Sequence, residues 1–422
     1  MTKDKIKVLT ISDHPLSPSG VGTQTNYMIR SLLDTGNFQV ISLGGAMKHD
    51  DYTPVLVEPY DGDWKIFPCD GYGDKNLIRS MLRQFKPDIL YFMTDPRFYE
   101  FLWQMEDEIR ESVPMVYYHV WDNYPYPYYN KVWYKSNDLI ATISKVTSDI
   151  VQNVCPEVEE KYVPHAVDDS IFKSRTTPQD LENIKQFREQ IGAADKFVVF
   201  WNNRNARRKQ SGSLIFWWKT FLDKIGHDKA ALVMHTDTRD PHGQPLDVLA
   251  AHLGLNKGQV IFSTQKLSSS HLAMMYAGAD VTINIADAEG FGLGTLESLA
   301  CGTPIIVNMT GGLQEQVTDG ENWFGIGIKP ASKCIIGSGL VPWIYEDRVS
   351  EKDVVDALEK MYNMSNEERK NLGKLGQKNF KYKNYSFEKF KTTWVKLMTD
   401  VYEKNGSWKN RKNYKSWKVD TL

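Results

Sequence analysis

Cysteine is scarce in this chain and long apolar runs are missing. The four cysteines, Cys69, Cys155, Cys301 and Cys334, have no paired spacing, which argues against a zinc site and against a disulfide framework. The nine histidines lack the i, i+4 spacing of a helical metal site. No stretch of eighteen apolar residues occurs, and the first residues run directly into a strand-like segment rather than a signal-peptide core. We therefore predict a cytoplasmic protein that requires no metal and no cofactor.

The chain also has no large excess of charge of one sign, since its formal net charge is only −2. No global field attracts nucleic acid, so no nucleic-acid partner is expected. The chain is 41% hydrophobic and 25% charged, which is typical of folded proteins. Its 422 residues are too many for one hydrophobic core and predict two or three domains.

Short apolar runs alternate with amphipathic stretches, the pattern of βα units around parallel sheets. In the first half we predict strands at 6–12, 40–43, 89–93, 116–120 and 139–143, and helices at 22–33, 76–85, 99–111 and 146–154. After a polar stretch at 173–180, strands are predicted at 197–201, 232–235, 260–262, 281–285 and 305–307. Two α/β domains are expected, with the active site in the cleft between them.

The most informative segment is EGFGLGTLE at 289–297, which follows a strand and precedes a Gly-Thr-Pro breaker. A strand, a glycine turn and a helix place backbone N–H groups where a phosphate can bind. Glu289 and Glu297 are eight positions apart, which at about 3.6 residues per turn predicts both carboxylates on one side of the helix. The alternative is an ordinary α/β turn whose glutamates complement the helix dipole.

A second glycine turn follows the first strand, which ends at Ser12 and Asp13. Gly20 and Gly22 allow a ligand to approach the backbone closely, so this loop is a second candidate surface for a phosphate or a sugar. A tight βα connection is the alternative. The full dinucleotide fingerprint is missing, which disfavours NAD.

Two further strand ends carry candidate side chains. Arg204 and Lys209 follow the strand at 197–201, where they could neutralise a diphosphate; a solvated charged loop is the alternative. His119 ends another strand and precedes an aromatic loop, whose faces and hydrogen-bonding groups suit a sugar. An ordinary aromatic loop with a structural histidine remains the alternative there.

The C-terminal part combines an amphipathic helix at 386–402 with a basic and aromatic segment at 404–418. Interleaved cations and aromatic rings can bind an anionic membrane surface. Packing of these aromatic side chains on the first domain is the alternative.

In their order along the chain, these segments resemble the retaining, two-domain GT-B glycosyltransferases of family 4, which are related in fold to glycogen and sucrose synthases. The resemblance covers residues 6 to about 402. Its strongest part is 289–306, which is similar to the family's E-x7-E segment, and it extends to SGVG at 19–22, VPHAVD at 163–168, the Arg204 and Lys209 pair, and GGLQE at 311–315. Departures are His165-Ala166 in place of the usual Asn-Gly, the missing glycine after Lys209, and an irregular stretch at 331–340.

The resemblance implies an α/β fold with two Rossmann-like doubly wound domains. Residues 1–175 would form the acceptor-side domain, on which 384–422 packs back, and 176–383 the donor domain. It implies that Glu297 binds the ribose, Glu289 the transferred sugar, Arg204 and Lys209 the diphosphate, and that His119 lies by the reacting centre. Of these, the catalytic group is His119, Glu289, Arg204 and Lys209. Further expected donor contacts are Gly20, Val21, Gly22, Lys266, Leu267, Gly290, Phe291, Gly292 and Leu293, and the expected acceptor contacts are Asp13, Trp121, Asp122 and Tyr124.

The function that follows from the resemblance is metal-independent, front-face transfer of a hexose from a UDP- or GDP-linked donor to a carbohydrate or lipid-linked acceptor, with retention of configuration. Double displacement with Glu289 as the nucleophile is the alternative mechanism. A nucleotide-sugar epimerase of the same fold is one alternative, and it would need no acceptor. A carbohydrate-binding protein without catalysis is the other. Peripheral membrane contact through the C-terminal segment is part of the prediction.

Overall fold

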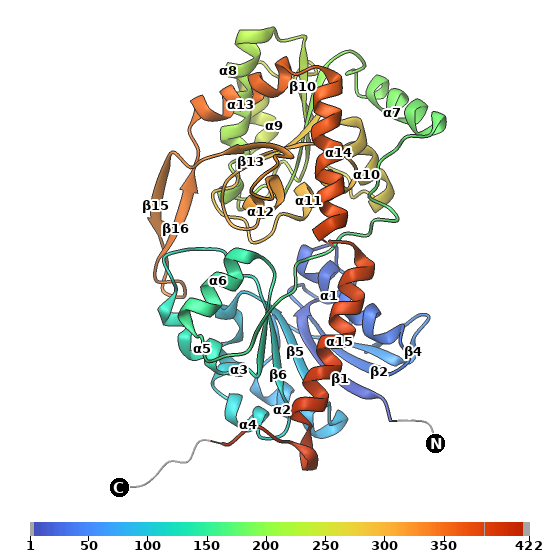
Figure 1. The fold of residues 1–422 in the computed structure, drawn as a ribbon, viewed down its shortest axis with the longest axis vertical. Helices are drawn as coiled ribbons and strands as arrows, with labels where there is room; N and C mark the ends of the chain where they lie inside the picture. Colours follow the sequence, from blue (N-terminus) through green and yellow to red (C-terminus); the bar gives the residue numbers. More distant parts are fainter. Residues whose placement is uncertain (1–3, 384, 417–422) are drawn as a thin grey trace. The chain divides into compact units, whose positions relative to one another are not determined.

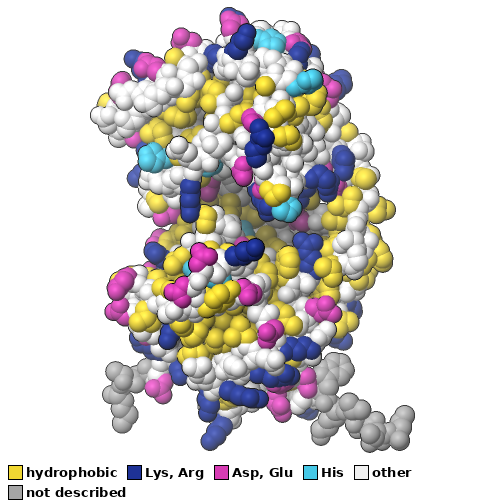
Figure 2. Space-filling view, turned by 180° about the vertical axis from the view of Figure 1, so that it is seen from behind, with side chains coloured by type: hydrophobic (Ala, Val, Ile, Leu, Met, Phe, Trp, Pro, Cys, Tyr) yellow, Lys and Arg dark blue, Asp and Glu magenta, His cyan; other side chains and the backbone are white. Residues whose placement is uncertain are grey.

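The computed structural model describes residues 4–383 and 385–416, and its chain divides into two compact units (Figure 1). The N-terminal unit comprises Met1–Ala166, Gly337–Pro342 and Phe387–Leu422, and the central unit comprises Val167–Ile336 and Trp343–Ser386. Among the described residues, no helix has an apolar stretch that could cross a membrane. On the face drawn in Figure 2, Lys and Arg side chains are interspersed with Asp and Glu.

The N-terminal unit is built on one twisted sheet with the strand order β3-β4-β2-β1-β5-β6-β7-β8. All neighbours pair in parallel except β3 with β4. The strands are β1 (Ile6–Asp13), β2 (Phe38–Gly45), β3 (Val55–Val57), β4 (Asp61–Pro68), β5 (Ile89–Thr94), β6 (Met115–His119), β7 (Leu139–Thr142) and β8 (Glu160–Tyr162). The five predicted strands are confirmed, whereas β3, β4 and β8 were missed because they lie at or next to the sheet edges and carry polar or exposed side chains.

The helices of this unit are α1 (Gly20–Leu33), α2 (Lys75–Phe85), α3 (Glu100–Trp103), α4 (Glu106–Arg110), α5 (Lys131–Lys135), α6 (Lys145–Val154) and α15 (Phe387–Asn405). The prediction of one helix at 99–111 is wrong. The buried residues Leu102, Trp103, Met105 and Ile109 do not follow one helical stripe, and the chain breaks between α3 and α4. The Trp103 indole instead donates to the carbonyl of Pro96 at 3.0 Å.

The C-terminal helix α15 packs against α1, although the two are separated by most of the chain (Figure 1). The Tyr27 and Phe387 rings lie 4.8 Å apart, and Phe390, Trp394, Leu397 and Val401 are buried. The amphipathic stripe predicted for 386–402 therefore faces the N-terminal unit.

The central unit contains a six-stranded parallel sheet with the order β11-β10-β9-β12-β13-β14. Its strands are β9 (Phe197–Asn202), β10 (Ala230–His235), β11 (Val260–Ser263), β12 (Val281–Asn284), β13 (Ile305–Asn308) and β14 (Gly325–Ile328), so all five predicted strands are confirmed. Its helices are α7 (Pro178–Gln190), α8 (Ser211–Ile225), α9 (Leu246–His252), α10 (Ser269–Gly278), α11 (Leu293–Ala300), α12 (Leu313–Val317), α13 (Glu351–Asn363) and α14 (Asn366–Lys383). Trp201, Trp218 and Phe221 are central to its hydrophobic core.

The stretch that the sequence left irregular forms an antiparallel hairpin of β15 (Ser332–Ile336) and β16 (Ile344–Arg348). Most of β15 is exposed, so it has no apolar alternation by which a pattern could reveal it. On β16, the side chain of Glu346 is buried.

Candidate functional site

The segment with the two glutamates forms a loop and then a helix, and the two residues lie in different parts of it. Helix α11 begins at Leu293 after Gly292, whose φ of +90° is in the left-handed region. Glu289 therefore lies in the loop before the helix and Glu297 lies on it, so the prediction that both share one helix face is wrong. A Cβ at Gly292 would lie 2.5 Å from Leu313 Cδ2, so this turn requires glycine.

The turn is held by Gln316 of α12, a residue that the sequence reasoning missed. Its Nε2 donates to the carbonyl of Phe291 at 2.7 Å and to that of Gly292 at 3.2 Å. Thr295 Oγ1 in turn donates to Gln316 Oε1 at 2.7 Å. Gln316 directly follows the 311–315 motif, and this position next to a motif was the signal in the sequence that could have indicated a role for it. The backbone conformation at Gly290–Leu293 thus depends on a neighbouring helix.

Glu289 forms an ion pair with Lys209, and both side chains are largely buried. Asn284 Nδ2 donates to Glu289 Oε2 at 3.2 Å, and Arg208 Nη1 donates to the carbonyl of Ala288 at 2.7 Å. Burial by itself raises the pKa of Glu289, but the charges of Lys209 and Arg208 and the hydrogen bonds outweigh it and hold the pKa below its usual value. Glu289 is therefore ionised at neutral pH. Arg208 is a further cation that the sequence reasoning did not select.

Glu297 lies in a different electrostatic environment. Its Oε2 accepts a hydrogen bond from the Tyr276 hydroxyl at 2.7 Å, and that hydroxyl accepts one from Asn202 Nδ2 at 2.8 Å. Burial raises the pKa of Glu297 to about 7, although the Tyr276 hydrogen bond opposes the shift. The two glutamates therefore differ in charge at neutral pH, one fully ionised and the other close to its midpoint.

Arg204 and Lys209, which were predicted to act together, have different partners. Arg204 Nε donates to Asp240 Oδ2 at 2.6 Å, and its Nη2 lies 2.8 Å from His242 Nδ1. Its side chain is 61% exposed, whereas that of Lys209 is 8% exposed. Lys209 is thus fixed in place by Glu289, and Arg204 is held at the surface.

Residues 207–210 are fastened to the strand-end loop at 287–289 and to β16. Arg207 forms a two-pronged ion pair with Glu346, and Gln210 Nε2 donates to Asp287 Oδ2 at 2.6 Å. The Asp287 N–H donates to the carbonyl of Arg208 at 2.8 Å. Burial, only partly offset by the Gln210 hydrogen bond, raises the pKa of Asp287 to about 6. Hairpin β15–β16 thereby supports the cationic segment.

Lys266 and Leu267 lie in the loop between β11 and α10, just before the N-cap Ser268. The Lys266 side chain is exposed and that of Leu267 is partly exposed. Their backbone is therefore at the carboxyl end of β11, near a helix start.

In the N-terminal unit, Gly20, Val21 and Gly22 form the first turn of α1. Ser19 caps this helix: its Oγ accepts from Gly22 N at 2.9 Å and donates to Asp13 Oδ2 at 2.6 Å. A Cβ at Gly22 would lie 2.5 Å from Ser17 Oγ, so the close approach here is intramolecular. The glycine turn and Asp13 are thus joined through Ser19.

His119 and its aromatic neighbours lie mostly inside the N-terminal unit. The His119 ring has no exposed surface, its Nε2 lies 2.7 Å from the Tyr134 hydroxyl, and burial lowers its pKa to about 3. Trp121 is 5% exposed, and Tyr124 donates to Asp149 Oδ2 at 2.6 Å. Asp122 is partly exposed. His119 is therefore a neutral, buried ring in this conformation.

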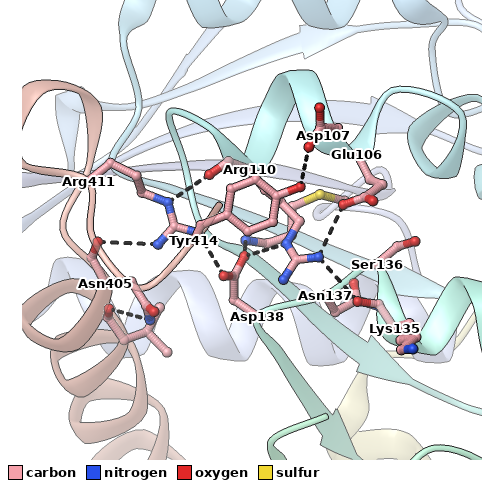
Figure 3. A network of polar contacts seen from close by, with 12 residues as sticks. Glu106, Asp107, Arg110, Lys135, Ser136, Asn137, Asp138, Asn405, Arg411 and Tyr414 are labelled. Carbon is pink, nitrogen blue, oxygen red and sulfur yellow. Dashed lines mark hydrogen bonds and ion pairs between the residues drawn. The ribbon is translucent and has the colours of Figure 1, made fainter. Parts of the chain in front are cut away.

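The described part of the basic C-terminal segment packs on the N-terminal unit (Figure 3). Arg411 Nη2 donates to Asp138 Oδ1 at 2.7 Å, and Tyr414 donates to Asp107 Oδ1 at 2.6 Å. The Trp408 indole donates to the carbonyl of Pro87 at 2.9 Å. These residues pack on the N-terminal unit, as the alternative to membrane binding predicted. Positions 417 and 418 of the predicted segment lie outside the described residues.

Residues 183–379 match the family described as glycosyl transferases group 1. The chain is 28% identical over 183 residues to alpha-monoglucosyldiacylglycerol synthase of Streptococcus pneumoniae, covering 43% of this chain and 40% of that protein. It is 27% identical over 192 residues to the GDP-mannose-dependent alpha-(1-6)-phosphatidylinositol monomannoside mannosyltransferase of Mycolicibacterium smegmatis, covering 44% and 47%. A D-inositol 3-phosphate glycosyltransferase of Acidothermus cellulolyticus is 41% identical over 85 residues, covering 20% and 18%. The matches span less than half the length of these curated relatives.

Solved structures match over nearly the whole chain. Sucrose-phosphate synthase from Thermosynechococcus elongatus has a TM-score of 0.74 at 14% identity, covering 96% of this chain and 100% of that one. Anabaena Alr3699/HepE in complex with UDP-glucose has a TM-score of 0.68 at 16% identity, covering 94% and 100%. At this identity the likeness shows the fold, which is GT-B.

Proposed function

We propose that this chain, whose residues 183–379 match the glycosyl transferases group 1 family, is a glycosyltransferase. It transfers a hexose from a nucleotide-diphosphate sugar to a carbohydrate or lipid-linked acceptor. The observation that carries the proposal is the pair of unlike glutamates: Glu289 is ionised against Lys209, and Glu297 is held by Tyr276 with a pKa of about 7. Two glutamates that only complemented the helix dipole would not need a buried lysine and a buried tyrosine as partners.

On the donor side, we assign Glu297 to the ribose hydroxyls, which can donate to its carboxylate. Tyr276 and Asn202 fix the carboxylate's orientation through their chain of hydrogen bonds. Glu289 accepts hydrogen bonds from hydroxyls of the transferred sugar, since its low pKa keeps it an acceptor. The Gly290–Leu293 backbone supplies N–H donors at the start of α11.

The leaving diphosphate is stabilised by Lys209 and Arg208 together with the helix start, in a mechanism that needs no metal. Arg204 joins them if its side chain leaves Asp240. Transfer proceeds on the front face with retention: the acceptor hydroxyl attacks as the C–O bond to the diphosphate breaks, and its proton passes to a leaving-group oxygen. Glu289 then positions the sugar and forms no covalent intermediate.

The test is a thermal-shift titration with UDP- and GDP-sugars. A ligand at about 100 times its dissociation constant stabilises a protein by roughly 2.7 kcal/mol. We expect Glu297→Gln to abolish this shift and Glu321→Gln, an exposed glutamate on the same unit, to keep it. An equal shift for Glu297→Gln and the native chain would refute the assignment of Glu297.

The two alternatives give different products. An epimerase converts donor without acceptor and releases an isomeric sugar, whereas a non-catalytic binding protein leaves the donor intact. Release of nucleoside diphosphate that depends on an added acceptor would support transfer against both.

A further inference from the structure

A line of aromatic rings and carboxylates follows the carboxyl edge of the sheet in the N-terminal unit. It is formed by residues 13–14 at the end of β1 and by the segments 46–52, 70–73 and 95–98, which follow β2, β4 and β5. Because β4, β2, β1 and β5 are neighbours in the sheet, the four segments lie side by side. Ligands of open α/β sheets bind at this edge.

The contacts along the line are continuous. The rings of Tyr52 and His49 lie 5.7 Å apart, and those of His49 and His14 lie 5.8 Å apart. Beyond His14, the Asp13 Oδ1 accepts from the Tyr72 hydroxyl at 2.8 Å, and the Tyr72 ring lies 5.3 Å from that of Phe98. The line therefore combines flat apolar faces with hydrogen-bond acceptors.

Two aromatic rings of this line are partly exposed. Tyr52 is 51% exposed and Phe98 is 43% exposed, whereas Tyr99, which lies 5.4 Å from the Tyr72 ring, is fully buried. Tyr99 makes the core contact and donates to the carbonyl of Met93 at 2.6 Å. The exposed rings offer surfaces on which the C–H face of a sugar can pack.

The charge of the line is negative. Its four segments contain Asp13, Asp50, Asp51, Asp70 and Asp95 against Lys48 and Arg97, which is five carboxylates and two cations, a net charge of −3 from these side chains. Arg97 already lies 3.7 Å from Asp95 and over the Phe98 ring. A phosphate or carboxylate on the ligand would meet this excess negative charge, whereas sugar hydroxyls can donate to it.

We propose that this surface binds the neutral saccharide end of the acceptor and discriminates against a phosphorylated one. The inference rests on the proposed function, because it names the acceptor class of the same reaction. It differs from what the names of several relatives indicate, namely those called D-inositol 3-phosphate glycosyltransferases.

Matched pairs of ligands test the inference by direct binding. Saturation-transfer NMR and calorimetry would compare methyl α-glucoside and methyl α-mannoside with their 6-phosphates, and myo-inositol with inositol 3-phosphate. We expect at least tenfold weaker binding of each phosphorylated ligand, and at least fivefold weaker binding of the neutral glycosides to Phe98→Ala. Equal or tighter binding of the phosphorylated ligands would overturn the inference.

Controls separate the site from folding and from donor chemistry. Phe216→Ala removes a similarly exposed ring from the central unit and should not change glycoside binding. Phe98→Leu keeps an apolar side chain but removes the ring, so it should still weaken glycoside binding if Phe98→Ala unfolds. Binding of octyl glucoside distinguishes the two sources of a neutral saccharide. A site for a glycolipid head group should bind octyl glucoside more tightly than methyl glucoside because of the alkyl chain, whereas a site for a free saccharide should not. Failure of UDP- and GDP-sugars to bind would refute the proposed function, while the neutral-against-phosphorylated comparison would still decide this inference.

Discussion

The strand-end loops of the two units differ in charge. In the central unit, β9 is followed by Arg204, Arg207, Arg208 and Lys209, and β12 by a glycine turn at a helix start. In the N-terminal unit the corresponding edge carries aromatic rings and a majority of carboxylates. Two sheets built from βα units therefore present opposite charge at the same kind of edge, which is the physical basis of the two binding proposals above.

The largest expected effect comes from breaking the buried ion pair of the central unit. Lys209→Met removes the ion-pair partner of Glu289, and removing one partner of a buried pair typically costs about 3–5 kcal/mol. We expect a loss of that order in the free energy of unfolding and at least a hundredfold loss of donor turnover. Denaturant titration and a nucleotide-release assay measure the two effects.

A double variant sharpens this result. Lys209→Met with Glu289→Gln removes both charges, so it should regain most of the stability and none of the turnover. Lys257→Met, at an exposed lysine of the same unit, is the control and should behave as the native chain. Full turnover in Lys209→Met would contradict a role for the cation in catalysis.

The second-largest effect is a pH dependence of stability that comes from Glu297 and distinguishes it from Glu289. Because the pKa of Glu297 is raised to about 7, its contribution to stability is complete below about pH 4.5 and is lost as pH rises through 7. Glu297→Gln removes this loss, so at pH 8 it should be more stable than the native chain by about 3 kcal/mol, with little difference at pH 4.5. Unfolding titrations at both pH values test this, with Glu321→Gln as the control; an equal gain at both would contradict the titration of Glu297.

A smaller effect is expected at the glycine turn. Gly292→Ala adds a Cβ in the left-handed region and against Leu313, which should cost about 1–3 kcal/mol and weaken donor binding. Gly320 has a similar positive φ of +101°, and a Cβ there would have no heavy atom within 4 Å. Gly320→Ala therefore measures the cost of the backbone strain alone. Thermal unfolding of both variants would show whether the additional packing cost exists.

The smallest effect on stability belongs to Arg204→Ala. Its ion pair with Asp240 is exposed, and such pairs contribute about 0–1 kcal/mol. If Arg204 moves to the diphosphate, donor affinity should nevertheless fall about tenfold, whereas Arg239→Ala, which breaks an exposed pair with Asp247, should leave it unchanged. Calorimetry with a UDP-sugar distinguishes the two variants; unchanged affinity in Arg204→Ala would leave Lys209 and Arg208 as the diphosphate cations.

Much of the fold could be predicted from the sequence, because parallel strands and amphipathic helices leave a local signal. All ten predicted strands exist, and the stripe of α15 is buried as its spacing indicates. The segment at 99–111 was misread because its buried residues follow tertiary contacts rather than one helix period. Hairpin β15–β16 was missed because exposed strands carry no apolar alternation.

The sequence by itself determined the order of the elements and which residues stand at strand ends, since both depend on neighbours a few positions away. Only the tertiary structure decided the partners: Lys209 pairs with a glutamate 80 positions away, Arg204 turns to Asp240, and Tyr276 orients Glu297. The left-handed Gly292 separated Glu289 from the helix on which spacing had placed it. Ionisation follows from such contacts, because burial and charge at a carboxylate are set by residues that the chain brings together from distant segments.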